Sequence, residues 1–176
     1  MLQTLQDGTA VRIRPIEPGD KSRLQNALGQ LSRESIRRRF LAAKPELSAA
    51  ELRYLTEVDG VDHLALLAVL ADDADQIAGV ARCVRLEPGG DTAEFAIVVA
   101  DPLQGEGLGT VLAAALADAA CRVGIRRFAA TTLADNEAVE RLLDTFATSL
   151  EHQALGDGVR EIVAVLPDCG AARLAA

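Results

Sequence analysis

The amino-acid sequence predicts an α+β fold with a mixed, mostly antiparallel central sheet. Short apolar or alternating runs have the length and period of strands. In other segments apolar residues recur at three- and four-residue intervals, as on the buried face of a helix. Three strand-like runs follow one another with only short turns between them, which favours antiparallel pairing.

The N-terminal part combines one strand with short helices. VRIRPI at 11–16 alternates apolar and charged residues, which predicts a half-buried first strand. Residues 18–45 predict two short helices that end at Lys44 and Pro45. Their apolar faces are formed by Leu24, Leu28 and Leu31 in one helix and by Ile36 and Phe40 in the other.

A third short helix and three strands follow. Ser48 and Glu51 have capping-box spacing, so we expect a helix over 48–58. The strands are predicted at 63–70, 76–86 and 91–99, the first two as a hairpin around ADDAD and the last after the turn PGG.

The C-terminal part alternates helix and strand before a final hairpin. Apolar spacing predicts a helix from about Gly107 to Val123, ended by Gly124. We then expect a strand at 126–133, a helix at 135–147 and a hairpin over 149–166 that turns at 156–158, with a tail at 169–176 that frays.

Composition predicts one soluble domain over residues 1–176. With 49% hydrophobic residues and no Gly/Ser-rich or Pro-rich linker, the chain can bury a substantial core. Its net charge of -8 disfavours nucleic acid and anionic membranes as partners. No apolar stretch of membrane-spanning length or secretory signal is found, so we expect a cytoplasmic location.

Neither a disulfide framework nor a metal site is predicted. Cys83, Cys121 and Cys169 are odd in number, lack CxxC spacing and read as small buried or incidental residues. His63 and His152 are too isolated in sequence to suggest a metal pair or a catalytic triad.

The loop QGEGLG at 104–109 carries the main functional signal. Glycines at 105, 107 and 109 let the backbone approach a ligand, and the following helix N-terminus offers unpaired amides to a phosphate. A Rossmann fingerprint would need a parallel βαβ unit, and a Walker loop would need GK[ST]. Neither context is present, so both nucleotide-binding classes are excluded.

QGEGLG after IVVADPL resembles the Q/RxxGxG/A loop of the GNAT acetyltransferase superfamily, and the element order over 9–166 resembles it too. VRIRPIEPGD, LSRES...RRF, LTEVD and AEFAIVV are similar to the catalytic domains of bacterial Pat-type protein lysine acetyltransferases. The resemblance implies an αβα sandwich with about six or seven strands, splayed between the fourth and fifth, and helices on both faces.

The same resemblance implies that acetyl-CoA binds in the opening between those strands, with no metal required. Main-chain groups of Ile97 and Val99 would pair with the pantetheine arm. Amides from Gln104 to Thr110, including those of Gly105, Gly107 and Gly109, would hold the pyrophosphate.

Glu94 in AEF is the candidate general base. Similar Pat-type domains use a glutamate at the matching place, and we expect apolar surroundings there to raise its affinity for a proton. The alternative is a glutamate at the rim of the sheet, paired with Arg82 or Arg85 on a neighbouring strand.

Two positions near the fifth strand bear on the cofactor and the leaving thiol. Asn136 matches a family position that contacts the pantetheine arm or orders its loop; capping of the next helix is the equal alternative. Leu143 stands where many relatives have a tyrosine that protonates the thiolate, and ATSLE replaces the following GF.

The arginines leave two roles open. In IRRRF we expect a solvated face with Glu34 paired to Arg38; the alternative is an arginine that binds an acid on the substrate or a CoA phosphate. The candidates for the ribose phosphate are Arg122, Arg126, Arg127 and Arg141.

Three functions remain open at this point. The first is an acetyl-CoA-dependent N-acetyltransferase acting on protein lysines, and the second is the same enzyme acting on a small amine. The third is a non-catalytic acyl-CoA sensor, which Leu143 and the missing GF make credible. Because dimers are common among similar proteins, a homodimer is also an expectation.

Overall fold

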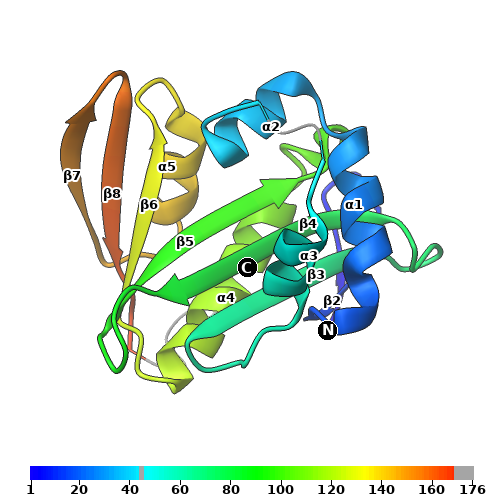
Figure 1. The fold of residues 1–176 in the computed structure, drawn as a ribbon, viewed down its shortest axis with the longest axis horizontal. Coiled ribbons are helices and arrows are strands. Elements are labelled where there is room, and N and C mark those ends of the chain that lie inside the picture. The colour runs from blue at the N-terminus through cyan, green and yellow to red at the C-terminus, as the bar shows by residue number, and fades with distance from the viewer. Residues whose placement is uncertain (44–45, 169–176) are drawn as a thin grey trace.

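The strands form one eight-stranded sheet. The computed structural model describes residues 1–43 and 46–168. The strand order is β1-β2-β3-β4-β5-β6-β8-β7, and only β5 and β6 are parallel neighbours (Figure 1). The strands are β1 (Leu2–Thr4), β2 (Ala10–Pro15), β3 (His63–Leu70), β4 (Ile77–Arg85), β5 (Thr92–Val99), β6 (Arg127–Leu133), β7 (Ser149–Gly156) and β8 (Val159–Val165). The predicted mixed, mostly antiparallel sheet is confirmed.

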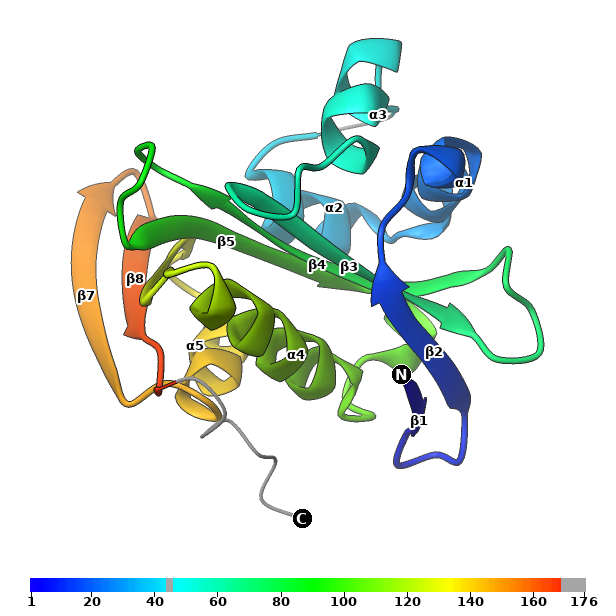
Figure 2. The same cartoon turned by 90° about the horizontal axis from the view of Figure 1, so that it is seen from below.

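Helices cover both faces of this sheet. Figure 2 shows α1, α2 and α3 on one face and α4 and α5 on the other, as the αβα expectation requires. The helices are α1 (Lys21–Gln30), α2 (Arg33–Phe40), α3 (Ala49–Thr56), α4 (Leu108–Arg122) and α5 (Glu137–Asp144), with 3-10 turns at Pro18–Asp20 and Asp101–Leu103.

The parallel pair β5 and β6 separates soon after it begins. Their ladder runs only from Thr92↔Arg127 to Glu94↔Ala129, whereas β5 pairs with β4 as far as Val99. Figure 1 shows the two strands starting together and then diverging. The predicted splay is confirmed, and in the observed numbering it lies between the fifth and sixth strands.

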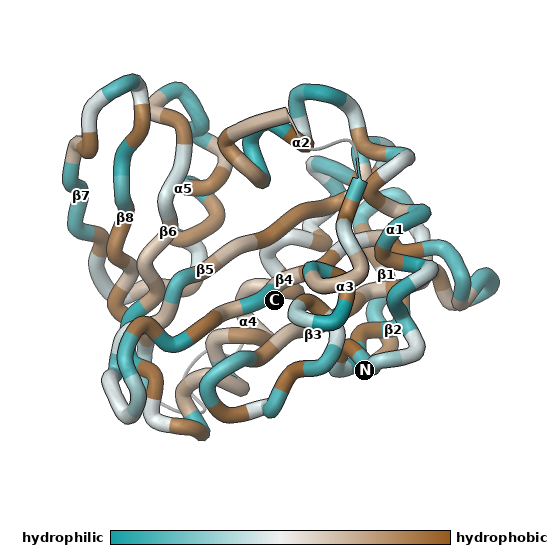
Figure 3. Tube along the Cα trace, in the orientation of Figure 1, coloured by the Kyte–Doolittle hydropathy of each residue, from teal (hydrophilic) through white to brown (hydrophobic). Residues whose placement is uncertain are grey.

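The core has one part on each side of the sheet. α4 contributes Leu108, Leu112 and Leu116 to the larger cluster, in which Phe95 stacks on Phe128 with ring centroids 5.1 Å apart. The smaller cluster lies under α1 and α3. Figure 3 shows hydrophobic residues along the central strands β4 and β5.

Local signals in the sequence are largely confirmed. Ser48 and Glu51 form the predicted capping box of α3, with Ser48 Oγ accepting from the Glu51 amide at 3.3 Å. The final hairpin turns at 156–158, where all three residues have positive φ. The strand β1 was not predicted. Helix α2 ends at Phe40 because Leu41 takes a left-handed conformation, so the expected helix end at Lys44 and Pro45 is wrong. The expected fraying of the tail at 169–176 lies outside the described residues.

No helix in the described part of the chain combines the length and hydropathy needed to cross a bilayer.

Candidate functional site

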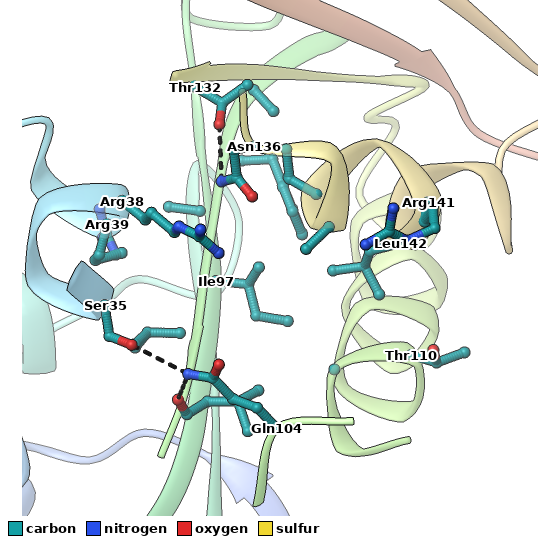
Figure 4. Close-up of a pocket in the computed structure, with 18 of the residues that line it drawn as sticks. Ser35, Arg38, Arg39, Ile97, Gln104, Thr110, Thr132, Asn136, Arg141 and Leu142 are labelled. Atoms are coloured by element: carbon teal, nitrogen blue, oxygen red, sulfur yellow. Dashed lines mark hydrogen bonds between the residues drawn. The ribbon is translucent and has the colours of Figure 1, made fainter. Parts of the chain in front are cut away.

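A cleft of about 690 Å³ opens where β5 and β6 separate. Its walls come from α2, the outer half of β5, the loop before α4, the end of β6, and α5. Figure 4 shows Arg38 and Arg39 on α2 at one side of β5 and Thr110, Arg141 and Leu142 on α4 and α5 at the other. Side chains from both sides of the strand therefore line the cleft.

The glycine loop takes the conformation that its sequence predicts. Gly105 and Gly107 have φ of 86° and 85°, a region that residues with a Cβ disfavour. Gly107 is the N-cap of α4, and no side chain of the described residues caps the helix there. The positive end of α4 thus faces the cleft with amides available to an anion.

Gln104 is held in place by its side chain. Its Nε2 donates to the Val99 carbonyl and to Ser35 Oγ, both at 3.1 Å. The carbonyl, one of the main-chain groups of Val99 that were expected to pair with the pantetheine arm, therefore already accepts a hydrogen bond from the loop. From Phe95 onward β5 has β4 on one side and no ladder partner on its β6 side within residues 1–43 and 46–168. That free edge, which includes Ile97, can take a strand-like ligand.

Asn136 lines the cleft and is the N-cap residue of α5, but its side chain does not cap the helix. Its Nδ2 donates to Thr132 Oγ1 at 3.0 Å, and α5 has no hydrogen bond from an N-cap side chain. The capping alternative for Asn136 is therefore wrong. Among the described residues, no group donates a hydrogen bond to the side-chain oxygen of Asn136. This oxygen can therefore accept a hydrogen bond from a ligand.

Glu94 lines the cleft but is exposed, so the expected apolar surroundings are wrong. Side chains alternate along a strand, and Ala93 and Phe95 enter the core on the opposite face. The pairing alternative is not observed either. Arg85 pairs with Asp62 at 2.7 Å, and no ion pair in the described part of the chain includes Glu94.

We predicted that the three arginines of IRRRF lie on a solvated face of α2, and this is confirmed for Arg37 and Arg38. Arg38 pairs with Glu34 at 2.7 Å, as expected, and Arg37 is also exposed near that carboxylate. Arg39 is partly buried and lines the cleft.

Of the four arginines suggested for a ribose phosphate, only Arg141 lines the cleft. It pairs with Glu137 at 3.0 Å on the exposed surface of α5. Arg127 pairs with Asp91, and Arg126 donates to the carbonyl of Cys121.

Several site residues escaped sequence reasoning because their partners are distant in sequence. Asp101 accepts from the Ser32 amide and hydroxyl and from the Ser35 hydroxyl, at 2.7 to 2.8 Å. Burial alone would raise the pKa of Asp101, but these hydrogen bonds hold it below its usual value. The Gln6 amide donates to the Glu106 carbonyl at 3.2 Å, so the N-terminal hairpin supports the loop.

Buried polar residues lie behind the cleft. Arg82 donates to His63 Nε2 and to the Leu55 carbonyl, both at 3.1 Å. Burial and the charge of Arg82 lower the pKa of His63 to about 4, so its ring is neutral and accepts this hydrogen bond. His63 therefore has a packing role, and no group of metal-ligating side chains occurs in the described ranges.

The cysteines differ from one another. Cys83 is buried and free, and burial raises the pKa of its thiol to about 12, which makes it inert. Cys121 is buried near the C-terminal end of α4, as expected of a small buried residue. Cys169 lies outside the described residues.

Residues 32–146 match the family described as "Acetyltransferase (GNAT) family". The chain belongs to the GNAT acetyltransferase family. This segment begins at the Ser32 cap of α2 and ends after α5, so it contains both sides of the cleft. The resemblance inferred from the glycine loop is thereby confirmed.

Two relatives and one solved structure define the likeness further. The chain is 36% identical to Acetyltransferase Pat of Mycolicibacterium smegmatis over 85% of its own length and 44% of that protein. It is 32% identical to Acetyltransferase PA5475 of Pseudomonas aeruginosa over 80% of this chain and 76% of that one. The GNAT domain of S. lividans PAT superposes with a TM-score of 0.82 at 33% identity, covering 94% and 96% of the two chains. The chain thus spans less than half of the Mycolicibacterium protein.

Leu143 stands where the resemblance implied a tyrosine, and its side chain has no proton to donate. It is fully buried in the core, and its neighbour Leu142 lines the cleft instead. An acid that protonates the leaving thiolate therefore has to come from elsewhere, for example from water.

Proposed function

We propose that this chain transfers the acetyl group of acetyl-CoA to a primary amine, and that the amine is a lysine side chain of a protein. The observation that carries this proposal is the unpaired edge of β5 after Glu94, which ends at the amides that begin α4. The edge suits a pantetheine arm and the amides suit a pyrophosphate.

The residues around the cleft fit acetyl-CoA. A Cβ at Gly105 would meet nothing within 4 Å, so a diphosphate has room to approach the loop. Gly109 lies on the first turn of α4, where Val99 and Leu142 are its neighbours. We assign the loop from Gln104 to Thr110, with Gly105, Gly107 and Gly109, to the pyrophosphate, and Ile97, Val99 and Asn136 to the pantetheine arm.

The chemistry needs a base because the amine must lose a proton. A lysine with a pKa near 10.4 is only about 0.04% neutral at pH 7. The neutral nitrogen attacks the thioester carbonyl, the C–N bond forms and the C–S bond breaks. Glu94 accepts the amine proton, directly or through water, and the thiolate departs with a pKa near 8.5.

A lysine acceptor agrees with the charge of the chain. The net charge of -8 attracts a cationic partner and steers it toward the surface. The likeness to Pat proteins also supports a lysine acceptor. This chain covers only part of the Mycolicibacterium relative. The absence of a nucleic-acid partner and a cytoplasmic location stay predictions.

The test is thiol release from acetyl-CoA with lysine peptides and a panel of small amines, with products identified by mass spectrometry. Glu94→Gln is expected to lower kcat/KM about 10²- to 10⁴-fold with the affinity for acetyl-CoA retained. Acetylation of small amines alone would support the acetyltransferase activity but would replace the protein lysine by a small amine as the acceptor. Acetyl-CoA binding without transfer would favour the non-catalytic sensor, which the burial of Leu143 makes a specific second candidate.

A further inference from the structure

Arg39 occupies the acceptor side of the cleft. It lies near the C-terminal end of α2, and its charge interacts with Glu94 without forming an ion pair within 4.0 Å. Figure 4 shows it across β5 from Thr110 and Leu142, away from the loop assigned to the pyrophosphate. A phosphate of CoA at the start of α4 is thus on the other side of the strand.

Arg39 differs from the other arginines of the cleft in having no carboxylate partner among the described residues. Arg38 pairs with Glu34 at 2.7 Å and Arg141 pairs with Glu137 at 3.0 Å. The guanidinium carbon of Arg39 instead lies 5.0 Å from the ring centroid of Phe40. Stacking on the ring fixes the guanidinium and leaves its N–H groups for another partner.

A second arginine lies behind Arg39. The side chain of Arg82 is buried, and its two hydrogen-bond acceptors are the neutral His63 ring and the Leu55 carbonyl. Arg39 and Arg82 together line a smaller cavity of about 60 Å³ next to the cleft. Burial, followed by the charge of Arg39, lowers the pKa of Arg82 to about 10.

Partial burial of two guanidinium groups without a carboxylate partner costs free energy, because each charge loses part of its hydration. Burial likewise lowers the pKa of Arg39, an effect that Glu94 only partly offsets. A carboxylate bound to Arg39 would compensate this charge with bidentate hydrogen bonds. The arrangement is therefore an anion site beside the candidate base.

We propose that Arg39 binds a carboxylate carried by the acceptor, close to the amine that Glu94 deprotonates. This inference rests on the proposed acetyl transfer. For a protein lysine, the carboxylate belongs to an aspartate or glutamate that lies beside it. The α-carboxylate of a free amino acid has the same chemistry, and the experiment separates these two sources.

The experiment compares acetylation of paired lysine peptides that differ only in one acidic residue or its amide, placed in turn at each position flanking the lysine. Free lysine and lysinamide form a second pair. We expect at least one acidic peptide to exceed its amide partner roughly 10- to 100-fold in kcat/KM, as for a hydrogen bond to a charged group. A preference confined to free lysine over lysinamide assigns the carboxylate to a free amino acid instead.

Variants tie the preference to Arg39. Arg39→Gln should remove the preference while the KM for acetyl-CoA stays the same, and Arg39→Lys should restore part of it. Arg37→Gln on the same helix is the matched control, since Arg37 is exposed outside the cleft and should leave the preference intact. Equal rates on all acidic and amide partners, or a preference that survives Arg39→Gln, would overturn the inference while leaving the proposed function standing.

If no acceptor is acetylated, that result counts against the proposed function itself. A binding measurement then tests the carboxylate site independently of acetyl transfer. Acetylated acidic and amide peptides are titrated into the wild-type protein and Arg39→Gln in the presence of CoA. Tighter binding of an acidic peptide to the wild-type protein alone supports the carboxylate site, and equal affinities contradict it. Thermal melts of each variant establish that it is folded. Should Arg39→Gln fail to fold, the inference is tested by the wild-type protein with the paired peptides and by Arg39→Lys.

Discussion

Ser35 Oγ donates a hydrogen bond to Asp101 Oδ1 at 2.7 Å, across 66 residues of sequence. The same hydroxyl accepts from Gln104 Nε2 at 3.1 Å. Helix α2, which carries Arg39, is therefore attached to the loop that begins α4. This connection joins the acceptor side of the cleft to the cofactor side.

Asp101→Ala should weaken this connection. The substitution removes three acceptor contacts to Ser32 and Ser35, and we expect it to lower the free energy of unfolding by about 1–3 kcal/mol. It should also raise the KM for acetyl-CoA, because Gln104 loses its support. Denaturant unfolding and steady-state kinetics measure the two effects. Asp72→Asn, in an exposed turn, is the control; an Asp101→Ala protein as stable as that control would contradict the account.

Gly107→Ala should impair cofactor binding more than its backbone strain alone explains. Gly107 and Gly124 have φ of 85° and 86° at opposite ends of α4, so alanine costs each about 1–2 kcal/mol. Only Gly107 lies at the proposed pyrophosphate site. Calorimetry should show about a tenfold or greater loss of CoA affinity for Gly107→Ala and little change for Gly124→Ala. Equal losses in both would point to a general effect of strain.

His63 should make stability depend on pH in the acidic range. Burial lowers its pKa from 6.5 to about 4, so the unfolded chain binds a proton that the folded protein does not. The stabilisation is complete above pH 6.5 and falls as the pH drops toward 4. His63→Asn should flatten the Tm profile over this window. A wild-type Tm that is constant from pH 6.5 to 4 would contradict this.

Asp20→Asn should be among the most destabilising single substitutions. Asp20 is almost fully buried and pairs with Arg14 through both carboxylate oxygens, at 2.6 and 2.7 Å. Burial would raise its pKa, but the hydrogen bonds from Arg14 and Arg23 hold it below 3.8. Removing one partner of such a pair costs about 3–5 kcal/mol.

Exposed Asp75 also pairs with Arg23, and Asp75→Asn should cost only about 0–1 kcal/mol. Chemical denaturation compares the two variants. Because the folded pKa of Asp20 is depressed, its contribution is present above pH 3.8 and is lost below it. A cost for Asp20→Asn as small as that for Asp75→Asn would refute the buried pair.

Local chemistry explains which features the sequence could predict. The capping box at Ser48 and Glu51 and the left-handed turn at Gly107 depend on neighbours a few residues away. The exposure of Glu94 could also have been predicted, because Ala93 and Phe95 alternate with it along one strand. Apolar neighbours in sequence do not bury a residue whose side chain points to the other face.

Contacts between distant segments explain what could not be predicted. The proximity of Arg39 to Arg82 depends on how α2 packs against the sheet, and the Ser35–Asp101 contact depends on the end of β5. Propensity and periodicity describe each element but not the side chains that meet between elements. Three consecutive arginines look alike in sequence, and only packing separates Arg39 from Arg37 and Arg38.

The most direct test of the central claim is calorimetric titration of coenzyme A and of pantetheine into the wild-type protein. If the glycine loop and the start of α4 bind the pyrophosphate, coenzyme A binds at one site per chain. Pantetheine, which lacks the diphosphate together with the adenosine 3′-phosphate attached to it, should then bind at least about tenfold more weakly. Absence of binding by coenzyme A, or equal affinity for the two compounds, would contradict the account.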